Sequence, residues 1–449
     1  MENTLLVKNS ENPLLKDPKA YGLKKKTSWH NNNRTIVVEN IYVVDLEDLS
    51  NQPIKIIKDL FNYKLECKDE TFVLIPVAGW TTKKPNVLSQ IFSIKGKEER
   101  LLEEYTKSFS LSPFITVTKD TSLVLRVSKE AQKMKIIKDG DQDYFEVTAG
   151  VRITDGDQFL FKKGFALLPN MSTIHVVSFI GGQGTGIYGP TKNYSSMTTD
   201  IVSMKIINAY GTKMTLSSKE NPHLFEVLRD CHLGACLVRK ITMKIEPKFL
   251  MKRDDMLFKD VNELKEHMIK DNLIDKEHFI AMYIPVDIGS QGEHASRIRI
   301  TNCERFNGKP PKKMETQEHK DFCDYFNLKL TETGEPLIDL ITKSPKLREF
   351  FPFVLKAGTL KTYGTEKTSS KINYSAPTLH ILGTYTSLPI FDINWLIHVE
   401  NVEDARELLL NLLELSEKLL IEYAKDHEYP IFNAFSRYIK GIWYPEGKG

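Results

Sequence analysis

A glycine-rich segment is the part of this sequence best suited to hold a ligand. Five glycines occur from Gly181 to Gly189, shortly after the apolar, β-branched residues 173–177. Glycine adopts positive φ angles and lets a ligand approach the backbone within contact distance. Such a cluster costs chain entropy and is rarely kept merely to turn the chain, so we interpret it as a ligand-binding loop. A loose loop between two strands is the alternative.

A second candidate loop lies earlier in the chain. The apolar residues 71–77 predict a buried strand, and Gly79, Trp80, Thr81, Thr82 and Lys83 follow it. Backbone amides in such turns form anion-holding nests, and threonine hydroxyls add donors. A diphosphate held between the two loops is therefore a chemically sensible ligand. Neither loop fits the G-x-G-x-x-G or G-x-x-x-x-G-K-[ST] fingerprint, which disfavours the common dinucleotide and triphosphate folds.

The composition indicates a two-domain globular protein without a polyanionic partner. A chain of 449 residues is long for one core, so two domains are expected. The 62 Lys and Arg residues exceed the 59 Asp and Glu residues by only 3, so we predict no nucleic-acid partner. No apolar run is long enough for a membrane span. Residues 1–35, with a basic run at 23–26, are expected to be a solvated, poorly ordered tail.

The cysteines and the N-terminus favour a cytoplasmic protein with free thiols. The five cysteines are scattered and odd in number, and the N-terminus lacks a signal-peptide hydrophobic core. Cys231, His232 and Cys236 have a spacing that invites a zinc site, but no second ligand pair lies nearby. We therefore predict no metal.

The first half of the chain alternates between strand and helix patterns. Strands are predicted at residues 123–127, 145–151, 201–208, 213–216 and 238–245, and helices at 48–62 and 154–163. Gly164 is placed to end the second helix, and Tyr210-Gly211 to turn a hairpin. Asn221 and Pro222 begin a further helix as N-cap and first residue.

The second half begins near residues 247–254 and predicts an α+β domain. Asp260 caps a helix at 261–269, and Asn401 with Asp404 opens a helix at 405–424. Residues 379–383 and 391–396 are strand-like. The apolar stripe of the last helix is interpreted as helix core; it consists of Leu408, Leu412, Leu415 and Leu419.

The order of these segments resembles the vanillyl-alcohol oxidase type of FAD-binding protein, most closely the flavoprotein (type II) cholesterol oxidases and the aldonolactone oxidases. Residues 76–86 stand where that family has its first pyrophosphate loop, and 145–151 match its V-x-A-G-x strand. Residues 180–189 resemble its glycine-rich GGxxxxGHGT loop, and 200–242 track the segments that follow it. A weaker likeness covers 390–440.

The resemblance implies an α+β, two-domain fold with an FAD-binding domain at 36–248 and an α+β substrate (cap) domain at 249–449. It implies an oxidoreductase that uses FAD to oxidise a small-molecule alcohol, with a sterol or a sugar lactone as candidate substrates and O2 as a candidate electron acceptor. The implied cofactor-binding residues are Gly79, Trp80, Thr81, Thr82, Lys83, Gly181, Gly182, Gln183, Gly184, Thr185, Gly189, Gly234 and Val238. Arg437 is the implied catalytic residue.

The departures from the family pattern are informative. Gln183 stands where many relatives have the histidine that bonds covalently to the flavin, so we expect non-covalent FAD. Phe435 stands where the family has a glutamate, whereas Arg437 is kept. Relatives continue past this motif, so with the sequence ending at Gly449 a short protein and an incomplete sequence are both open.

Alternatives to this function follow from the same departures. One is a flavin-binding or vestigial homologue that acts through protein contacts without turnover, and another is an α/β scaffold without flavin. Arg437 is interpreted either as a cation over the flavin or as a structural ion pair with Glu428 or a neighbouring residue. The histidines on apolar segments are interpreted as hydrogen-bonded core residues; they are His175, His380 and His398.

Overall fold

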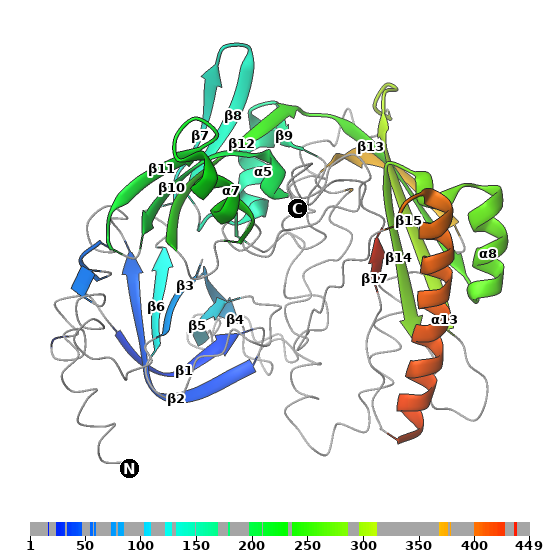
Figure 1. Ribbon diagram of the computed structural model, residues 1–449, viewed down its shortest axis with the longest axis horizontal. Helices are drawn as coiled ribbons and strands as arrows, with labels where there is room; N and C mark the ends of the chain where they lie inside the picture. Colours follow the sequence, from blue (N-terminus) through cyan, green and yellow to red (C-terminus); the bar gives the residue numbers. More distant parts are fainter. Residues whose placement is uncertain are drawn as a thin grey trace, which may run out of the picture.

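Three β-sheets organise this computed structural model (Figure 1). The residues that the structure describes are 17, 24–31, 34–46, 54–56, 58–59, 73–77, 80–84, 103–108, 122–127, 132–148, 150–168, 178–179, 197–208, 210–231, 236–285, 296–311, 368–375, 378, 399–426 and 435–437.

The first sheet has the strand order β3-β6-β2-β1-β5-β4. Its strands are β1 Lys24–Asn31, β2 Arg34–Leu46, β3 Val73–Val77, β4 Trp80–Lys84, β5 Glu103–Ser108 and β6 Ser122–Val127. β6 pairs in parallel with both β2 and β3, while β1 with β2 and β4 with β5 are antiparallel. The strands predicted around residues 71–77 and 123–127 are confirmed as β3 and β6.

Two segments of the first sheet differ from the sequence-based expectation. Residues 24–31, expected in a poorly ordered tail, form β1 and pair with β2. Residues 80–84, expected as a loop, form β4 and pair with β5. In both segments the backbone N–H and C=O groups bond to a neighbouring strand. The polar composition of each segment, taken alone, predicts that these groups face solvent.

The second sheet has the order β11-β10-β12-β8-β7, with β9 also paired to β12. Its strands are β7 Met134–Asp139, β8 Gln142–Thr148, β9 Phe165–Leu167, β10 Ile201–Asn208, β11 Lys213–Ser217 and β12 Cys236–Pro247; a 3-10 turn, η3, spans Met197–Asp200. Helices α5 Ile153–Lys162 and α7 Pro222–Cys231 pack on one face. That core includes Phe145, Val147, Leu160, Phe225 and Ile241, all buried.

Local signals placed most elements of the second sheet correctly. Gly164 has φ +84° directly after α5, and Gly211 has φ +76° in the β10–β11 hairpin. Asn221 precedes α7 in a left-handed conformation, and its side-chain amide donates to the Thr215 carbonyl at 3.0 Å. The predicted strand 145–151 is wrong at its end, because β8 stops at Thr148.

The third sheet has the order β16-β13-β15-β14-β17, and helices α8 and α13 cover one of its faces (Figure 1). Its strands are β13 Leu250–Phe258, β14 His278–Pro285, β15 Ser296–Phe306, β16 Thr368–Tyr374 and β17 Phe435–Arg437. The helices are α8 Val261–Lys270 and α13 Val402–Asp426, with a 3-10 turn, η4, at Leu273–Asp275.

The caps of both helices are confirmed. The Asp260 carboxylate accepts from the backbone N–H of Glu263 at 2.9 Å. Asn401 Oδ1 accepts from the Asp404 N–H at 2.8 Å, and its amide donates to the Asp404 carboxylate. These bonds give partners to backbone N–H groups of the first turn, which have none within the helix.

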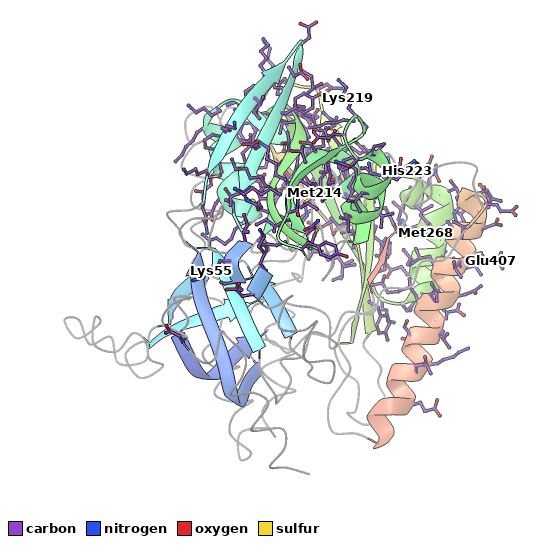
Figure 2. All side chains as sticks on the ribbon, turned by 60° about the vertical axis from the view of Figure 1, so that its left-hand side comes forward. Lys55, Met214, Lys219, His223, Met268 and Glu407 are labelled. Carbon is purple, nitrogen blue, oxygen red and sulfur yellow. The ribbon has the colours of Figure 1, made fainter. Side chains whose placement is uncertain are left out.

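The predicted core stripe of the last helix is partly wrong. Leu409 and Leu413 are buried against the sheet, whereas Leu415 and Leu419 are 50% and 55% exposed. Figure 1 shows that the C-terminal end of α13 runs past the strands of the third sheet. Glu407 points away from the sheet on the outer side of the helix (Figure 2). The strand-like segments 379–383 and 391–396, together with His175, His380 and His398, lie outside the described residues.

Short contacts join the second sheet to the third at the β12–β13 connection. The Arg305 guanidinium of β15 donates to both carboxylate oxygens of Glu246 of β12, at 3.0 and 2.8 Å. It also stacks over the ring of Phe249, 4.1 Å from the ring centroid. Phe161 of α5 meets Tyr374 of β16 edge-on. The domain limits 36–248 and 249–449 stay predictions.

Candidate functional site

Most residues predicted to bind the cofactor lie outside the described residues. This group consists of Gly79, Gly181, Gly182, Gln183, Gly184, Thr185, Gly189 and Gly234. Their role as the cofactor loops stays a prediction.

The remaining predicted cofactor residues lie in two strands. Trp80, Thr81, Thr82 and Lys83 belong to β4, the edge strand of the first sheet. Val238 lies in β12, and its side chain is buried in the core of the second sheet. A ligand can therefore reach Val238 only through its backbone.

Arg437, the predicted catalytic residue, ends β17 at the edge of the third sheet. It lies opposite Ile280 on β14, and Ile280 lies opposite Thr301 on β15. Thr301 in turn lies opposite Asp255 on β13. Because directly opposed residues share one face of a sheet, Arg437 and Asp255 lie on the same face. This is the face opposite α8 and α13, on the side where the other two sheets lie (Figure 1).

A charged network occupies that face around Asp255. The Asp255 carboxylate accepts from Thr301 Oγ1 at 2.6 Å and contacts Arg299 Nη2 at 2.9 Å. Arg253 Nε lies 2.9 Å from its other oxygen. The Asp255 and Arg299 side chains are 12% and 11% exposed, so these charges interact with little solvent screening. Two guanidinium groups thus share one carboxylate.

The network keeps Asp255 ionised. Burial by itself would raise the pKa of the Asp255 carboxyl, but the charges of Arg253 and Arg299 and the hydrogen bonds from Thr301 and Arg299 lower it below its ordinary value. A carboxylate held in this way is a poor proton acceptor near neutral pH, and its effect is to fix the two guanidinium groups in place.

His278 lies on the same face, one row further along β14. Its side chain is buried, and neither ring nitrogen has a hydrogen-bond partner within the described residues. Burial, with a smaller contribution from the charge of Arg305, lowers the pKa of His278 to about 3. It is opposite Cys303, whose thiol pKa is raised by burial to about 12. Both side chains are therefore neutral near pH 7.

On the second sheet, a buried carboxylate lies among three lysines. Glu146 is 4% exposed and contacts Lys135, Lys205 and Lys240 at 3.3, 3.1 and 3.2 Å. Burial would raise the pKa of Glu146, but the three ammonium groups lower it to about 2. This cluster lies on the face opposite α5 and α7.

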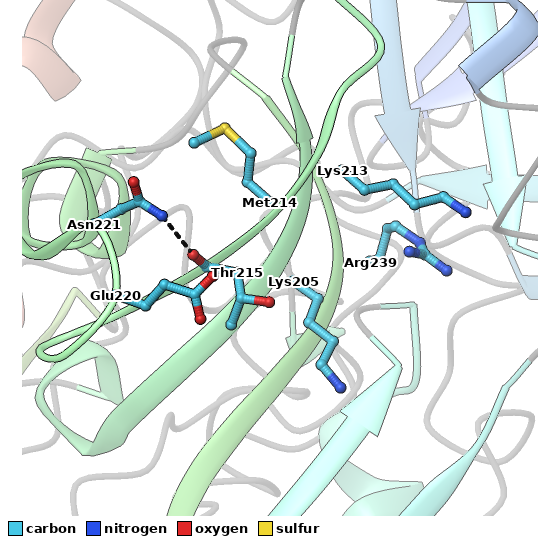
Figure 3. Close-up of a pocket in the computed structure, with 7 residues that line it drawn as sticks. All are labelled: Lys205, Lys213, Met214, Thr215, Glu220, Asn221 and Arg239. Atoms are coloured by element: carbon cyan, nitrogen blue, oxygen red, sulfur yellow. Dashed lines mark hydrogen bonds between the residues drawn. The ribbon is translucent and has the colours of Figure 1, made fainter.

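A pocket of about 320 Å³ opens beside Lys205 on this face (Figure 3). It is lined by Lys205, Lys213, Met214, Thr215, Glu220, Asn221 and Arg239. Within the described part of the chain, no group of three or more His, Cys, Asp or Glu side chains is arranged to hold a metal ion. No helix among the described residues is both long and apolar enough to cross a membrane.

Sequence reasoning missed both charged clusters, although each left a signal. Arg253 and Asp255 alternate in β13, and Arg299 and Thr301 alternate with isoleucines in β15. This spacing of two puts polar side chains on one face of a strand. The sequence of each strand, taken alone, does not tell which other strands lie beside it.

Comparison with known proteins gives relatives of one kind. No model of a protein family matches this sequence. The chain is 30% identical over 114 residues to a D-arabinono-1,4-lactone oxidase of Debaryomyces hansenii, a match that covers 25% of this chain and 20% of that protein. It is 30% identical over 121 residues to an L-gulonolactone oxidase of Mus musculus, covering 26% and 27% respectively. The matches thus span about a quarter of each relative's length.

The fold is that of a solved cholesterol oxidase from B. sterolicum. The superposition has a TM-score of 0.54 at 10% identity and covers 90% of this chain and 70% of that one. The α+β fold of the vanillyl-alcohol oxidase type is therefore confirmed. The resemblance to aldonolactone oxidases and cholesterol oxidases is confirmed with it.

Proposed function

We propose that this protein is an FAD-dependent oxidoreductase that oxidises the CH–OH group of a small-molecule alcohol. The observation that carries the proposal is the shared fold together with the charged face of the third sheet, which is turned toward the first and second sheets. Sterols and sugar lactones are the substrate classes that the named relatives suggest. The electron acceptor we propose is O2.

The donor chemistry of the described residues fits a dinucleotide. Arg239, next to Val238 on β12, has a buried Nε without a partner among the described residues, and Lys213 lies near it. Such cations suit phosphate groups. FAD, when bound, would supply the acceptor for a hydride and thus the redox chemistry. We propose that it binds without a covalent bond, because Gln183 cannot form the histidine linkage.

The residues of the third sheet would bind and orient the substrate. Arg437, at the end of β17, would supply a positive charge where negative charge develops on an alcohol oxygen. The Asp255 network, two strands beyond Ile280, supplies hydrogen-bonding groups held in one geometry.

The first experiment asks whether flavin is present and how it is held. The purified protein is expected to absorb blue light and to release FAD into the supernatant on boiling or acid treatment. Fluorescence that stays with the protein band on a denaturing gel would contradict non-covalent binding. A colourless protein that also fails to take up added FAD would contradict the whole proposal.

The second experiment compares Arg437→Ala with Lys252→Ala. Each variant loses one positive charge from the third sheet. Lys252 is the control because it lies on the opposite face of that sheet. Arg437→Ala is expected to keep FAD but to slow flavin reduction by an alcohol about a hundredfold or more, whereas Lys252→Ala leaves it unchanged. Stopped-flow bleaching with a panel of sterols and lactones measures this. An equal rate in both variants would assign Arg437 a structural role, and absence of bleaching in the wild type would favour the non-catalytic homologue.

The cytoplasmic location stays a prediction. Cys236 and Cys303 are free thiols, which agrees with a reducing compartment. Fractionation of the native host with an antibody against this chain is the direct test.

A further inference from the structure

A β-bulge places Arg239 at the edge of the pocket on the second sheet. Lys205 of β10 pairs with Lys240, and the next residue, Ile206, pairs with Val238, so Arg239 is the extra residue between them. A bulge leaves its extra residue outside the regular ladder and redirects its side chain. Figure 3 shows Arg239 and Lys213 pointing the same way, while Lys205 points in another direction.

Two of the three cations that line this pocket, Lys213 and Arg239, have no acidic partner in the part of the chain that the structure describes. The charge of Lys205 is countered by Glu146 at 3.1 Å. Within the described residues neither Lys213 nor Arg239 forms an ion pair, and Arg239 Nε is buried without an acceptor. A buried donor left without a partner is destabilising, and like charges that line one pocket add to that cost. An anionic ligand would remove both costs.

The remaining lining favours a ligand rich in oxygen acceptors. Thr215 contributes a hydroxyl, and Glu220 is the single acid among the lining residues, so positive charge is in excess. Lys58 adds another cation at the hairpin turn, because its side chain packs where a Cβ on Gly211 would lie. Arginine and lysine together with a hydroxyl are typical donors for phosphate.

We propose that this pocket binds phosphate groups, through Arg239 and Lys213. The phosphate has two possible sources: the diphosphate of the dinucleotide cofactor, or a separate phosphorylated small molecule. The assignment rests on the bulge, the unpaired cations and the pocket, and it does not require the proposed oxidoreductase function.

The test uses inorganic pyrophosphate as the probe on the full chain, by isothermal titration, as purified and after flavin removal. Arg239→Gln and Lys213→Gln are each expected to weaken pyrophosphate binding about tenfold or more. Lys219→Gln changes an exposed charge in the connection between β11 and α7, outside the pocket lining, and is expected to leave pyrophosphate affinity within twofold. Arg239→Lys retains part of the affinity. Lys213 is exposed on an edge strand, so its variant tests the pocket without disturbing the core.

The outcomes separate the two sources. If pyrophosphate binds only the flavin-free protein and both variants also weaken FAD retention, the pocket holds the cofactor diphosphate. If it binds the flavin-loaded protein with one further site, the pocket holds a separate ligand. Pyrophosphate binding that is absent, or equal in all variants, together with unchanged FAD retention, would overturn the proposal. If the protein takes up no flavin but still binds pyrophosphate through Arg239, the phosphate-pocket proposal is supported and the oxidoreductase proposal is contradicted.

Discussion

The contact between Arg305 and Glu246 is expected to hold the second and third sheets together. Arg305→Met removes two charge-assisted hydrogen bonds and the stacking on Phe249, while keeping an apolar side chain of similar length. A hydrogen bond to a charged group contributes about 1.5 to 3 kcal/mol when well buried. Here the side chains are 30% and 22% exposed, which reduces the pair to about 1 to 2 kcal/mol.

Stacking on Phe249 adds about 0.5 to 1 kcal/mol, so Arg305→Met is expected to lower the free energy of unfolding by about 1.5 to 3 kcal/mol. Lys276→Met is the matched control. Lys276 contacts Glu304 at 3.2 Å in an exposed ion pair, and its loss is expected to cost less than about 0.5 kcal/mol.

The assay is a double-mutant cycle by urea unfolding with Arg305→Met, Glu246→Gln and their combination. A coupling energy of about 1 kcal/mol or more is expected between the two sites. Trypsin is expected to cleave faster after the exposed Lys248 in the Arg305 variant, since this residue lies in the connection between the sheets. The proposed role of the Arg305–Glu246 contact would be refuted by a coupling energy below about 0.3 kcal/mol together with a free energy of unfolding equal to that of the Lys276 control.

Four further variants test the cofactor loop and the second sheet. Gly182→Val or Gly184→Val should abolish FAD retention with modest loss of stability, measured by the flavin-to-protein absorbance ratio; full occupancy in both would exclude this loop as the cofactor site. Glu146→Gln should destabilise the protein at pH 7 by about 1 to 2 kcal/mol, after allowing for the solvent exposure of the lysines. The pKa of Glu146 falls from 4.5 to about 2 on folding, so its stabilising effect is complete above pH 4.5 and is lost as pH falls toward 2; urea unfolding at pH 7 and pH 3 should show a smaller difference in the variant. Gly156→Val should lower the midpoint of thermal unfolding, because a Cβ would lie 2.6 Å from the Phe179 ring and overpacking costs about 1 to 3 kcal/mol; an unchanged midpoint would contradict this packing.

Elements governed by local chemistry could be predicted from the sequence. Gly164 and Gly211 occupy positive φ, and Asp260 caps its helix, because these requirements involve only residues near in the chain. The identity of β4 could not be predicted in the same way. Trp80 to Lys84 form a strand only because Glu103–Ser108 lies beside them, and that pairing joins segments distant in sequence.

The exposed end of the last helix shows the same limit. Its apolar spacing predicts a helix with a continuous stripe, and the helix is present. Burial, however, depends on where the neighbouring sheet ends, and Leu415 and Leu419 lie beyond Leu413, the last buried leucine in the described part of the helix. The charged face of the third sheet is likewise a product of register, because Asp255, Thr301 and Arg437 come from three distant segments.

The charged face of the third sheet indicates which kind of catalysis its side chains could provide in the proposed reaction. Phe435 removes the acid that the family resemblance implies beside Arg437, and Phe435 lies opposite Met282. Asp255 is an acid on this face, but its lowered pKa makes it a weak base and its partners are already two guanidinium groups. His278 is neutral and is also a weak base, since its pKa is about 3. Among these side chains the face therefore offers positive charge rather than a proton acceptor, which favours stabilisation of a developing alkoxide over its formation by a carboxylate.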